Sequence, residues 1–439
     1  MSFDLVIRAA SAFVDGRFQP VEIGITDGRI AAIGVDLAGP VVELADDEVL
    51  IPGIVDTHVH VNEPGRTEWE GFASATRAAA AGVVTTIIDM PLNSIPTTIS
   101  AEALAVKRTV AADKVVVDTG FWGGAVPENL GRLRELHDAG VFGFKAFLAP
   151  SGIDEFGHLD AAQLELALDE IAALGSLLIV HAEDPAVLDA HANQGGTSYA
   201  AFVESRPDEA ETTAIDRVIA GVRRTGARAH ILHLSSAAAL PALRAARAEG
   251  LPITVETCPH YLVLSAESID DGATQFKCCP PIRGEANREA LWQALLDGDI
   301  DVIVTDHSPA TADLKFAGDG DFQVAWGGIA GLQTGFASVW TEAAARGIPL
   351  DRVLQWMSTG TADLVGLAQK GRITVGADAD LVAFAPDERF TVHAAELRHK
   401  NPISAFEGRD LRGVARRAWL RGHPIGDATV GALLETSRS

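Results

Sequence analysis

From residue 49 to about residue 305 the chain repeats one pattern of hydrophobic and polar positions. A short apolar, strand-like run is followed by a stretch rich in Ala, Leu and Glu that is long enough for a helix. The runs are almost continuously apolar, which is typical of parallel strands covered on both faces. They lie at residues 49–61, 83–90, 115–121, 143–148, 177–181, 229–234, 253–257 and 302–305. About eight such units over roughly 270 residues predict an α/β fold, a (β/α)8 TIM barrel.

The two ends of the chain have a different pattern, with short alternating strands and tight turns. Asp15-Gly16 and Asp27-Gly28 are two-residue hairpin signals between the apolar segments of the first 50 residues. After about residue 366 this style returns, in 371–382 and in a strand-like run at 390–392. We therefore expect residues 1–50 and 366–439 to pair into a smaller β-sandwich domain beside a barrel of residues 51–365.

Composition narrows the class of protein further. With 47% hydrophobic and 22% charged residues, the 439-residue chain is ordinary globular protein, and its net charge of −25 argues against nucleic acid and anionic membranes as partners. No apolar run is long enough to span a bilayer, and the N-terminus shows no secretory signal. Cys258, Cys278 and Cys279 make a poor disulfide framework. We expect a cytoplasmic protein that acts on a small molecule.

Candidate chemistry lies where the predicted strands end. Residues at the carboxyl ends of barrel strands face a common mouth, and His58 and His60 share one face of the first strand because alternate side chains do. Further polar side chains end the fourth, fifth, sixth and eighth strands: Lys145, His181, His233 and Asp306. Imidazole and carboxylate suit Zn²⁺, Mn²⁺ and Fe²⁺, and these ligands are too many for one tetrahedral zinc ion. The arrangement predicts a two-metal site.

Lys145 is the unusual member of this set, since an ammonium among metal cations would be repelled and would have to lose its charge. A carbamate formed from CO2 and the neutral amine would turn Lys145 into a bridging, carboxylate-like ligand. The alternative is a lysine that extends to the barrel rim beside Phe144 and Phe147. His260 and His307 lie near the same rim and are candidates for groups that orient the ligands.

These residues resemble the amidohydrolase superfamily, in particular the cyclic-amide hydrolases that include dihydroorotases, hydantoinases and allantoinases. The resemblance rests on 27–30, on Pro52-Gly53-Ile54-Val55-Asp56-Thr57-His58-Val59-His60, on the later ligands and on 376–382. It implies that His58, His60 and Asp306 hold one metal ion, that His181 and His233 hold the other, and that carboxylated Lys145 bridges them. It also implies two divalent ions, with Zn²⁺ first and Mn²⁺, Co²⁺ or Fe²⁺ as alternatives, and a homotetramer.

Within this superfamily, several segments look most like allantoinases: 62–72, 89–94, 276–283, 305–309 and 325–331. Dihydroorotases of similar pattern have an Arg where this chain has Asn62, which suits an uncharged ring better. Hydantoinases tend to have a tyrosine shortly after the lysine, where this chain has Ala149 and Pro150. The resemblance thus implies hydrolysis of allantoin to allantoate, with a dihydroorotase, a hydantoinase or a non-catalytic assembly protein as alternatives.

The expected mechanism is attack by a metal-bridging hydroxide, with Asp306 as general base and then general acid. Asn93 and Ser308 are candidates to bind polar groups of the substrate, although Asn93 is equally suited to a turn and Ser308 to a helix cap. Backbone amides near Cys279 or Gly327 are candidates to stabilise the negative charge that develops on the carbonyl oxygen.

Overall fold

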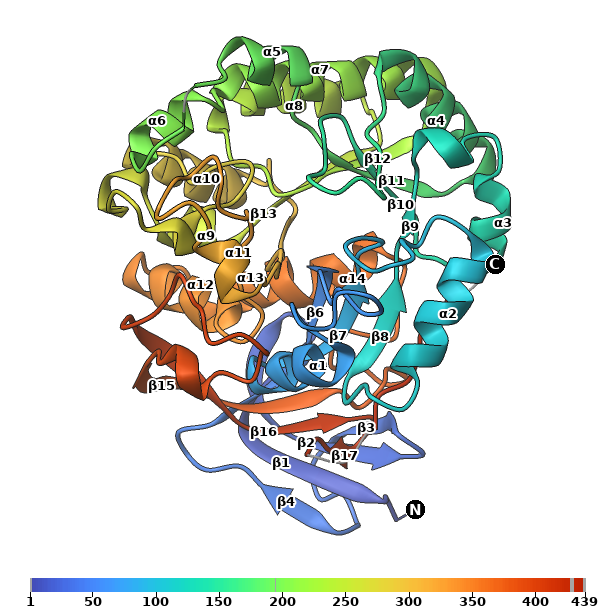
Figure 1. The fold of residues 1–439 in the computed structure, drawn as a ribbon. Coiled ribbons are helices and arrows are strands. Elements are labelled where there is room, and N and C mark those ends of the chain that lie inside the picture. The colour runs from blue at the N-terminus through green and yellow to red at the C-terminus, as the bar shows by residue number, and fades with distance from the viewer. Residues whose placement is uncertain (1, 194, 427–429, 437–439) are drawn as a thin grey trace.

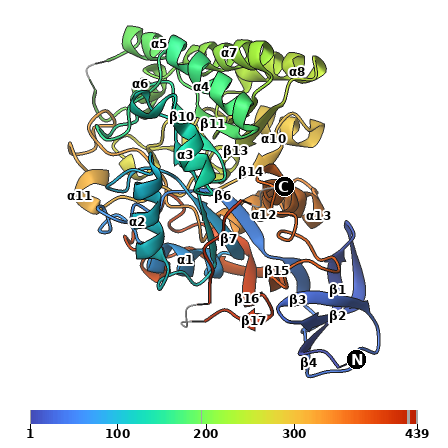
Figure 2. The ribbon, with the colours of Figure 1, turned by 90° about the vertical axis from the view of Figure 1, so that its right-hand side faces the viewer.

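The fold is a barrel with helices around it and a β layer at one end (Figure 1). It is known from a computed structural model that describes residues 2–193, 195–426 and 430–436. In Figure 2, which is turned by 90°, the strands from both ends of the chain lie together beside the barrel. The functional side chains lie within the barrel, so the description concentrates on how its strands are placed.

Within the described residues, a barrel strand overlaps each of the eight predicted apolar runs. These strands are β6 (Ile54–Val59), β7 (Val84–Asp89), β8 (Asp118–Phe121), β10 (Phe144–Phe147), β11 (Leu177–His181), β12 (Arg228–Ile231), β13 (Ile253–Thr257) and β14 (Val302–Ile303), with β9 (Gly123–Gly124) just after β8. They pair in parallel, β6 to β8 in one sheet and β9 to β14 in another. Val59 bridges to His307, just after β14, which joins the first strand to the last. The predicted (β/α)8 barrel is confirmed.

Helices follow the strands and cover the outside of the barrel. The longer ones are α1 (Phe72–Ala81), α2 (Ala101–Ala111), α4 (Ala161–Leu174), α7 (Asp208–Thr225), α8 (Leu240–Ala248), α10 (Glu285–Asp297) and α12 (Gly335–Ala345). The shorter ones are α3 (Leu133–Asp138), α5 (Pro185–Ala190), α6 (Tyr199–Glu204), α9 (Pro259–Val263), α11 (Ala312–Lys315), α13 (Leu350–Leu354) and α14 (Gly360–Leu364). Among the described residues, none of these helices has the length and apolar character that a membrane span needs.

Helix α4 shows how the sequence sets these boundaries. The Asp160 side chain accepts from the backbone N–H of Gln163, whose own side chain accepts from Asp160, and this capping box begins the helix. Gly175 ends it with φ 62°, a left-handed conformation that glycine adopts without steric cost. The buried face has helical spacing: Leu164, Ala167, Leu168 and Ile171. Local signals and burial therefore agree.

The β layer combines the two ends of the chain, as expected. Its strands are β1 (Leu5–Val14), β2 (Arg17–Thr26), β3 (Arg29–Gly34), β4 (Val41–Glu43), β5 (Val49–Pro52), β15 (Leu381–Thr391), β16 (Asp410–Leu420) and β17 (His423–Pro424), and β5 pairs with both β1 and β15. Asp15-Gly16 and Asp27-Gly28 turn the two hairpins with positive φ at both residues, as the sequence predicts. This shared sheet confirms the second, β-sandwich part of the fold.

The last described residues return to the barrel instead of ending in the β layer. Leu433 bridges to Thr119 in β8, and the backbone N–H of Gly431 donates to the carbonyl of Val115. The division of the chain at residues 50 and 366 stays a prediction.

Candidate metal centre and active-site cavity

One cavity of about 390 Å³ opens at the carboxyl ends of the barrel strands. Its lining includes every residue that the sequence analysis proposed for metal or substrate binding: His58, His60, Asn93, Lys145, His181, His233, Cys279, Asp306, Ser308 and Gly327. They come from strand ends and loops that lie far apart in the sequence. The barrel geometry therefore brings the proposed set into one place.

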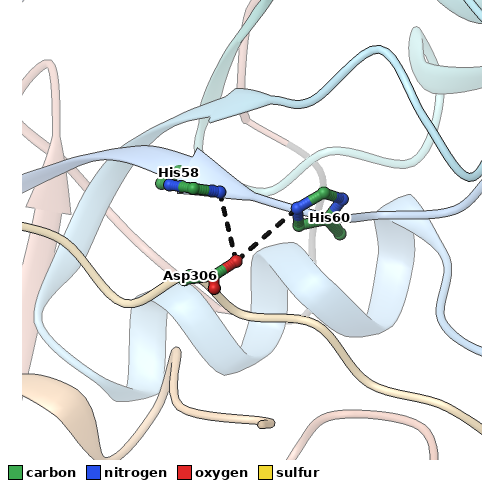
Figure 3. A group of neighbouring side chains, drawn as sticks. All are labelled: His58, His60 and Asp306. Carbon is green, nitrogen blue, oxygen red and sulfur yellow. Dashed lines mark ion pairs between the residues drawn. The ribbon is translucent and has the colours of Figure 1, made fainter. Parts of the chain in front are cut away.

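His58, His60 and Asp306 form the first corner of the cavity (Figure 3). The Oδ1 atom of Asp306 lies 3.1 Å from Nε2 of His58 and 3.5 Å from Nε2 of His60. The two imidazoles extend from the end of β6, and one potential ligand atom of each residue lies within 4.8 Å of the others. The predicted first metal corner is thus assembled with its donor atoms facing one another.

Two acceptors fix the orientation of these imidazoles. Nδ1 of His58 lies 2.5 Å from a carboxylate oxygen of Glu256 in β13, and Nδ1 of His60 lies 3.1 Å from the carbonyl oxygen of Leu92. A carbonyl oxygen only accepts, so His60 donates from Nδ1 and keeps a lone pair on Nε2. Both rings therefore present Nε2 to Asp306.

His181, His233 and Lys145 form the second corner. Nε2 of His181 lies 2.7 Å from Glu183, which leaves its Nδ1 as the nitrogen for a metal ion. The rings of His181 and His233 have centroids 4.6 Å apart, and Nζ of Lys145 lies 4.5 Å above the ring of Phe147. His233 lies just after β12 and not within a strand, and its backbone N–H donates to Glu256 at 3.1 Å.

Burial favours neutral imidazoles at three of the four positions. It lowers the pKa of His60 to about 3, lowers that of His181, and moves that of His233 well below its ordinary value. Neutral imidazole is the form that binds metal ions. These three side chains are therefore ready to act as ligands at neutral pH.

His58 and Lys145 respond to the negative charge around them. Burial lowers the pKa of His58, but the carboxylates of Asp306 and Glu256 raise it to about 9. Burial lowers the pKa of Lys145 to about 8, against the opposing effect of the same two carboxylates. The first corner attracts a positive charge, and the Lys145 amine is neutral in a substantial fraction of molecules near that pH.

The donor set fits divalent metal ions. It offers imidazole nitrogens and carboxylate oxygen, which suit Zn²⁺, Mn²⁺, Co²⁺ and Fe²⁺. Nδ1 of His233 is buried and has no hydrogen-bond partner among the described residues. Buried polar atoms normally have partners, so this nitrogen points to an additional group at the site.

Two carboxylates that sequence reasoning missed hold the ligands in place. Glu256 contacts the imidazoles of His58 and His230, and Glu183 contacts His181. Two features of the sequence could have identified these carboxylates. Glu183 stands two positions after His181, and Glu256 is a charged residue within an apolar strand. Of the expected orienting groups, His307 lies 3.3 Å from Glu70. His260 has its potential ligand atom within 4.8 Å of that of Asp306.

The candidate substrate-binding groups lie around the first corner. Asn93 donates from Nδ2 to the side-chain oxygen of Asn62 at 3.0 Å, and Ser308 donates from Oγ to Oδ1 of Asp306 at 2.8 Å. Asn62 is 1% exposed and does not line the cavity. Asn62 therefore reaches the cavity only through its contact with Asn93, and its expected part in the preference for an uncharged ring stays a prediction.

A (β/α)8 barrel whose strand ends collect imidazoles, a lysine and an aspartate defines the class of metal-dependent barrel hydrolases. Residues 49–423 match the model of the amidohydrolase family, so the chain belongs to that family. It is 55% identical to an allantoinase from Streptomyces avermitilis, with 96% of this chain and 95% of that protein covered. It is also 46% identical to a mitochondrial allantoinase from Aquarana catesbeiana, with 82% and 76% covered.

The fold is shared with a solved relative. The L-hydantoinase (dihydropyrimidinase) from Arthrobacter aurescens has a TM-score of 0.93 and 30% identity, with 99% of this chain and 100% of that chain covered. The resemblance to cyclic-amide hydrolases that the sequence motifs indicate is confirmed.

Proposed function

We propose that this protein is an allantoinase, which hydrolyses the cyclic amide bond of allantoin to give allantoate. The observation that supports this most is the joint placement of four imidazoles, Lys145 and Asp306 around one cavity. The 55% identity to a Streptomyces allantoinase extends over nearly the whole chain. The reaction is the addition of water to an amide carbonyl, followed by cleavage of the carbon–nitrogen bond.

In this proposal two divalent metal ions bind at the two corners. His58, His60 and Asp306 would hold the first ion, and His181 and His233 the second, with Lys145 as a carboxylated bridge. Zn²⁺ is the first choice, with Mn²⁺, Co²⁺ and Fe²⁺ as alternatives. Bound ions would lower the pKa of water to about 7 and polarise the amide carbonyl.

Asp306 is the proposed proton carrier. Burial raises the pKa of its carboxyl, but the surrounding imidazoles, above all His58, hold it well below the ordinary value. The carboxylate is therefore ionised at neutral pH and can accept the proton of the attacking water. It would return this proton to the ring nitrogen that leaves, so that a neutral amide nitrogen departs and a carboxylate forms.

The groups proposed to bind the ring are Asn93, Ser308 and the backbone near Cys279 and Gly327. Because Asn62 accepts one N–H of Asn93, the amide of Asn93 is held in one orientation. Its remaining donor and acceptor match the N–H and C=O of a cyclic ureide. Backbone N–H groups at Cys279 or Gly327 would stabilise the negative charge on the carbonyl oxygen.

The tyrosines of the chain support an allantoinase over a hydantoinase. The sequence has only Tyr199 and Tyr261, and their hydroxyls donate to the carbonyl oxygens of Ile282 and Pro280. Neither lines the cavity, so neither is placed to act as an oxyanion donor. A non-catalytic assembly protein is the weaker alternative, because every expected donor is in place.

A parallel rate assay tests the proposal. The purified protein is loaded with Zn²⁺, Mn²⁺, Co²⁺ or Fe²⁺ in turn, and kcat/KM is measured for allantoin, dihydroorotate and 5-substituted hydantoins. We expect allantoin to be the best substrate and chelation to abolish turnover. Faster turnover of dihydroorotate or the hydantoins at full metal occupancy would contradict the assignment, and a metal content near zero would favour the assembly protein.

Two further properties belong to this proposal. A homotetramer is implied by the resemblance to cyclic-amide hydrolases, and light scattering on the purified protein tests it. A cytoplasmic location is supported by the three cysteines, which are free thiols suited to a reducing compartment. Fractionation of cells that express the full chain tests the location.

A further inference from the structure

Besides the groups proposed to bind the ring, the cavity has three side chains that carry hydrogen-bond donors. Arg206, Lys277 and Gln323 line it, whereas Asp306 is the only carboxylate among the described lining residues. Lys277 already donates from Nζ to the carbonyl oxygen of Ala325 at 2.5 Å. It also contacts the carbonyl oxygen of Gln323 at 3.4 Å, and the side-chain amide of Gln323 donates to Asn193 and Ser205. Arg206 is the side chain of the three that has a whole nitrogen without an acceptor among the described residues.

The Arg206 guanidinium is held rigidly by one carboxylate. Nε and Nη2 donate to the two oxygens of Glu183 at 3.0 and 2.5 Å, and Glu183 is fully buried. Among the described residues, nothing accepts a hydrogen bond from Nη1, while 21% of the side chain is exposed. Because two nitrogens are fixed, the remaining one has a defined direction without further loss of conformational entropy.

The charge balance indicates what Arg206 would bind. Glu183 neutralises the guanidinium, so the pair presents N–H groups with little net charge. An uncharged oxygen acceptor suits such a pair better than a carboxylate, which Glu183 would repel. The ureido carbonyl of allantoin is an uncharged acceptor of this kind.

We propose that Arg206 forms a subsite for the ureido side group of the substrate, donating from Nη1 to the ureido carbonyl oxygen. This inference rests on the proposed allantoinase function. In this proposal the ring amide lies at Asp306, and the side group, which is attached to the carbon next to the reacting carbonyl, points toward Arg206. Arg206 thereby determines specificity for allantoin over rings that lack the side group.

A rival role for Arg206 is purely structural, because Glu183 also contacts His181. In that case loss of Arg206 would disturb the metal centre and slow all substrates alike. The ratio of kcat/KM for allantoin to that for unsubstituted hydantoin separates the two roles. Both substrates are measured on the same preparation, so this ratio does not depend on the folded fraction or on metal occupancy.

The variants are Arg206→Met and the double variant Arg206→Met with Glu183→Gln, which leaves no unpaired carboxylate in the protein interior. We expect each variant to lower the ratio by roughly tenfold or more, because the substrate loses one hydrogen bond from a charged donor. Arg217→Gln is the matched control, because Arg217 pairs with the neighbouring Asp184 at 2.6 Å but does not line the cavity. It should keep the wild-type ratio.

An unchanged ratio in both Arg206 variants would overturn the inference, and so would a wild-type preference for a hydantoin with a carboxymethyl side group over allantoin. Failure of the wild-type protein to hydrolyse allantoin, with turnover of hydantoin, would instead overturn the proposed function. The two failures are therefore distinguishable.

Discussion

In the proposed metal centre, Lys145 would change from a free amine into a carboxylated metal ligand. It lies 1% exposed among imidazoles, and among the described residues no carboxylate forms an ion pair with its Nζ. Burial lowers its pKa to about 8, so the neutral amine that reacts with CO2 becomes more abundant as the pH rises through that value. Carboxylation would convert an unpaired cation into a ligand.

We expect Lys145→Ala to lose most of its bound metal and its activity, because the bridging ligand is gone. Short carboxylic acids should restore part of the bound metal and part of the activity. Metal analysis and rate measurements on the same samples test this. Full retention of both metal ions without any effect of added acids would rule out the bridge. In the wild-type apoprotein, reconstitution with Zn²⁺ at a constant concentration of dissolved CO2 should be faster above a pH of about 8 than well below it, because more of the amine is neutral.

Asp306→Asn is expected to lower kcat by roughly 10²–10⁴, because the amide cannot accept the proton of the attacking water. The comparison variant is Ser308→Ala, which keeps the carboxylate and removes a single hydrogen bond at 2.8 Å. Its effect should be smaller, about tenfold. Steady-state rates at equal metal content provide the test, and normal activity in the Asp306→Asn variant would exclude the assigned role.

Sequence reasoning located the ligands but missed the residues that orient them. The ligands can be identified from the sequence because each lies in or just after an apolar run, which is a local signal. Glu256 contacts His58 across 198 positions, and Arg206 contacts Glu183 from a helix end. Such contacts depend on which strands become neighbours, which no local pattern specifies.

At the scale of elements, the strands are predictable from the sequence, and the segment 311–328, which contains the short helix α11, is not. Buried parallel strands have a strong apolar signal, whereas this segment is held by side-chain-to-backbone contacts. Lys315 donates from Nζ to the carbonyl oxygen of Lys277 at 2.9 Å and also contacts the carbonyl of Gly328. These contacts place the cavity wall that contains Gly327.

Gly328 is the position of this wall most sensitive to substitution. Its φ is +129°, and an added Cβ would lie 2.3 Å from the carbonyl oxygen of Ser308. We expect Gly328→Ala to lower the thermal midpoint and the affinity for substrate, since the wall must move away from Ser308. Gly327→Ala is the matched control for stability, because its Cβ would meet only Cys279 at an ordinary 3.7 Å. Equal thermal midpoints for the two variants would contradict this reading.

At the scale of the whole molecule, a buried ion cluster joins the barrel to the β layer. Nζ of Lys370 lies 2.5 Å from Asp118 in β8, 2.9 Å from Asp378 and 2.6 Å from Asp380, just before β15. Arg421, after β16, also pairs with Asp118. These three aspartates have the spacing of a metal site, but the Lys370 ammonium lies among them and balances their charge.

Lys370→Met is expected to destabilise the protein by about 3–5 kcal/mol, because buried carboxylates lose their partner. Burial raises the pKa of the Asp380 carboxyl against the opposing effect of Lys370, and without the ammonium this pKa rises further. The loss of stability should therefore be larger at neutral pH than in mild acid, where Asp380 becomes protonated. Denaturant titration at both pH values measures this. Arg372→Met is the control, because Arg372 is partly exposed and pairs with the exposed Asp363, and it is expected to cost about 1 kcal/mol or less. A loss that is independent of pH would contradict the ion-pair account.

The sequence by itself determined the barrel, the β layer made from both chain ends and the metal-ligand candidates, because periodicity, turn residues and strand-end positions are local properties. The tertiary structure alone decided that Asn62 contacts Asn93, that Glu183 and Glu256 contact the imidazoles, and that Arg206 lines the cavity. Those roles depend on contacts between distant strands and loops, which form only when the barrel closes.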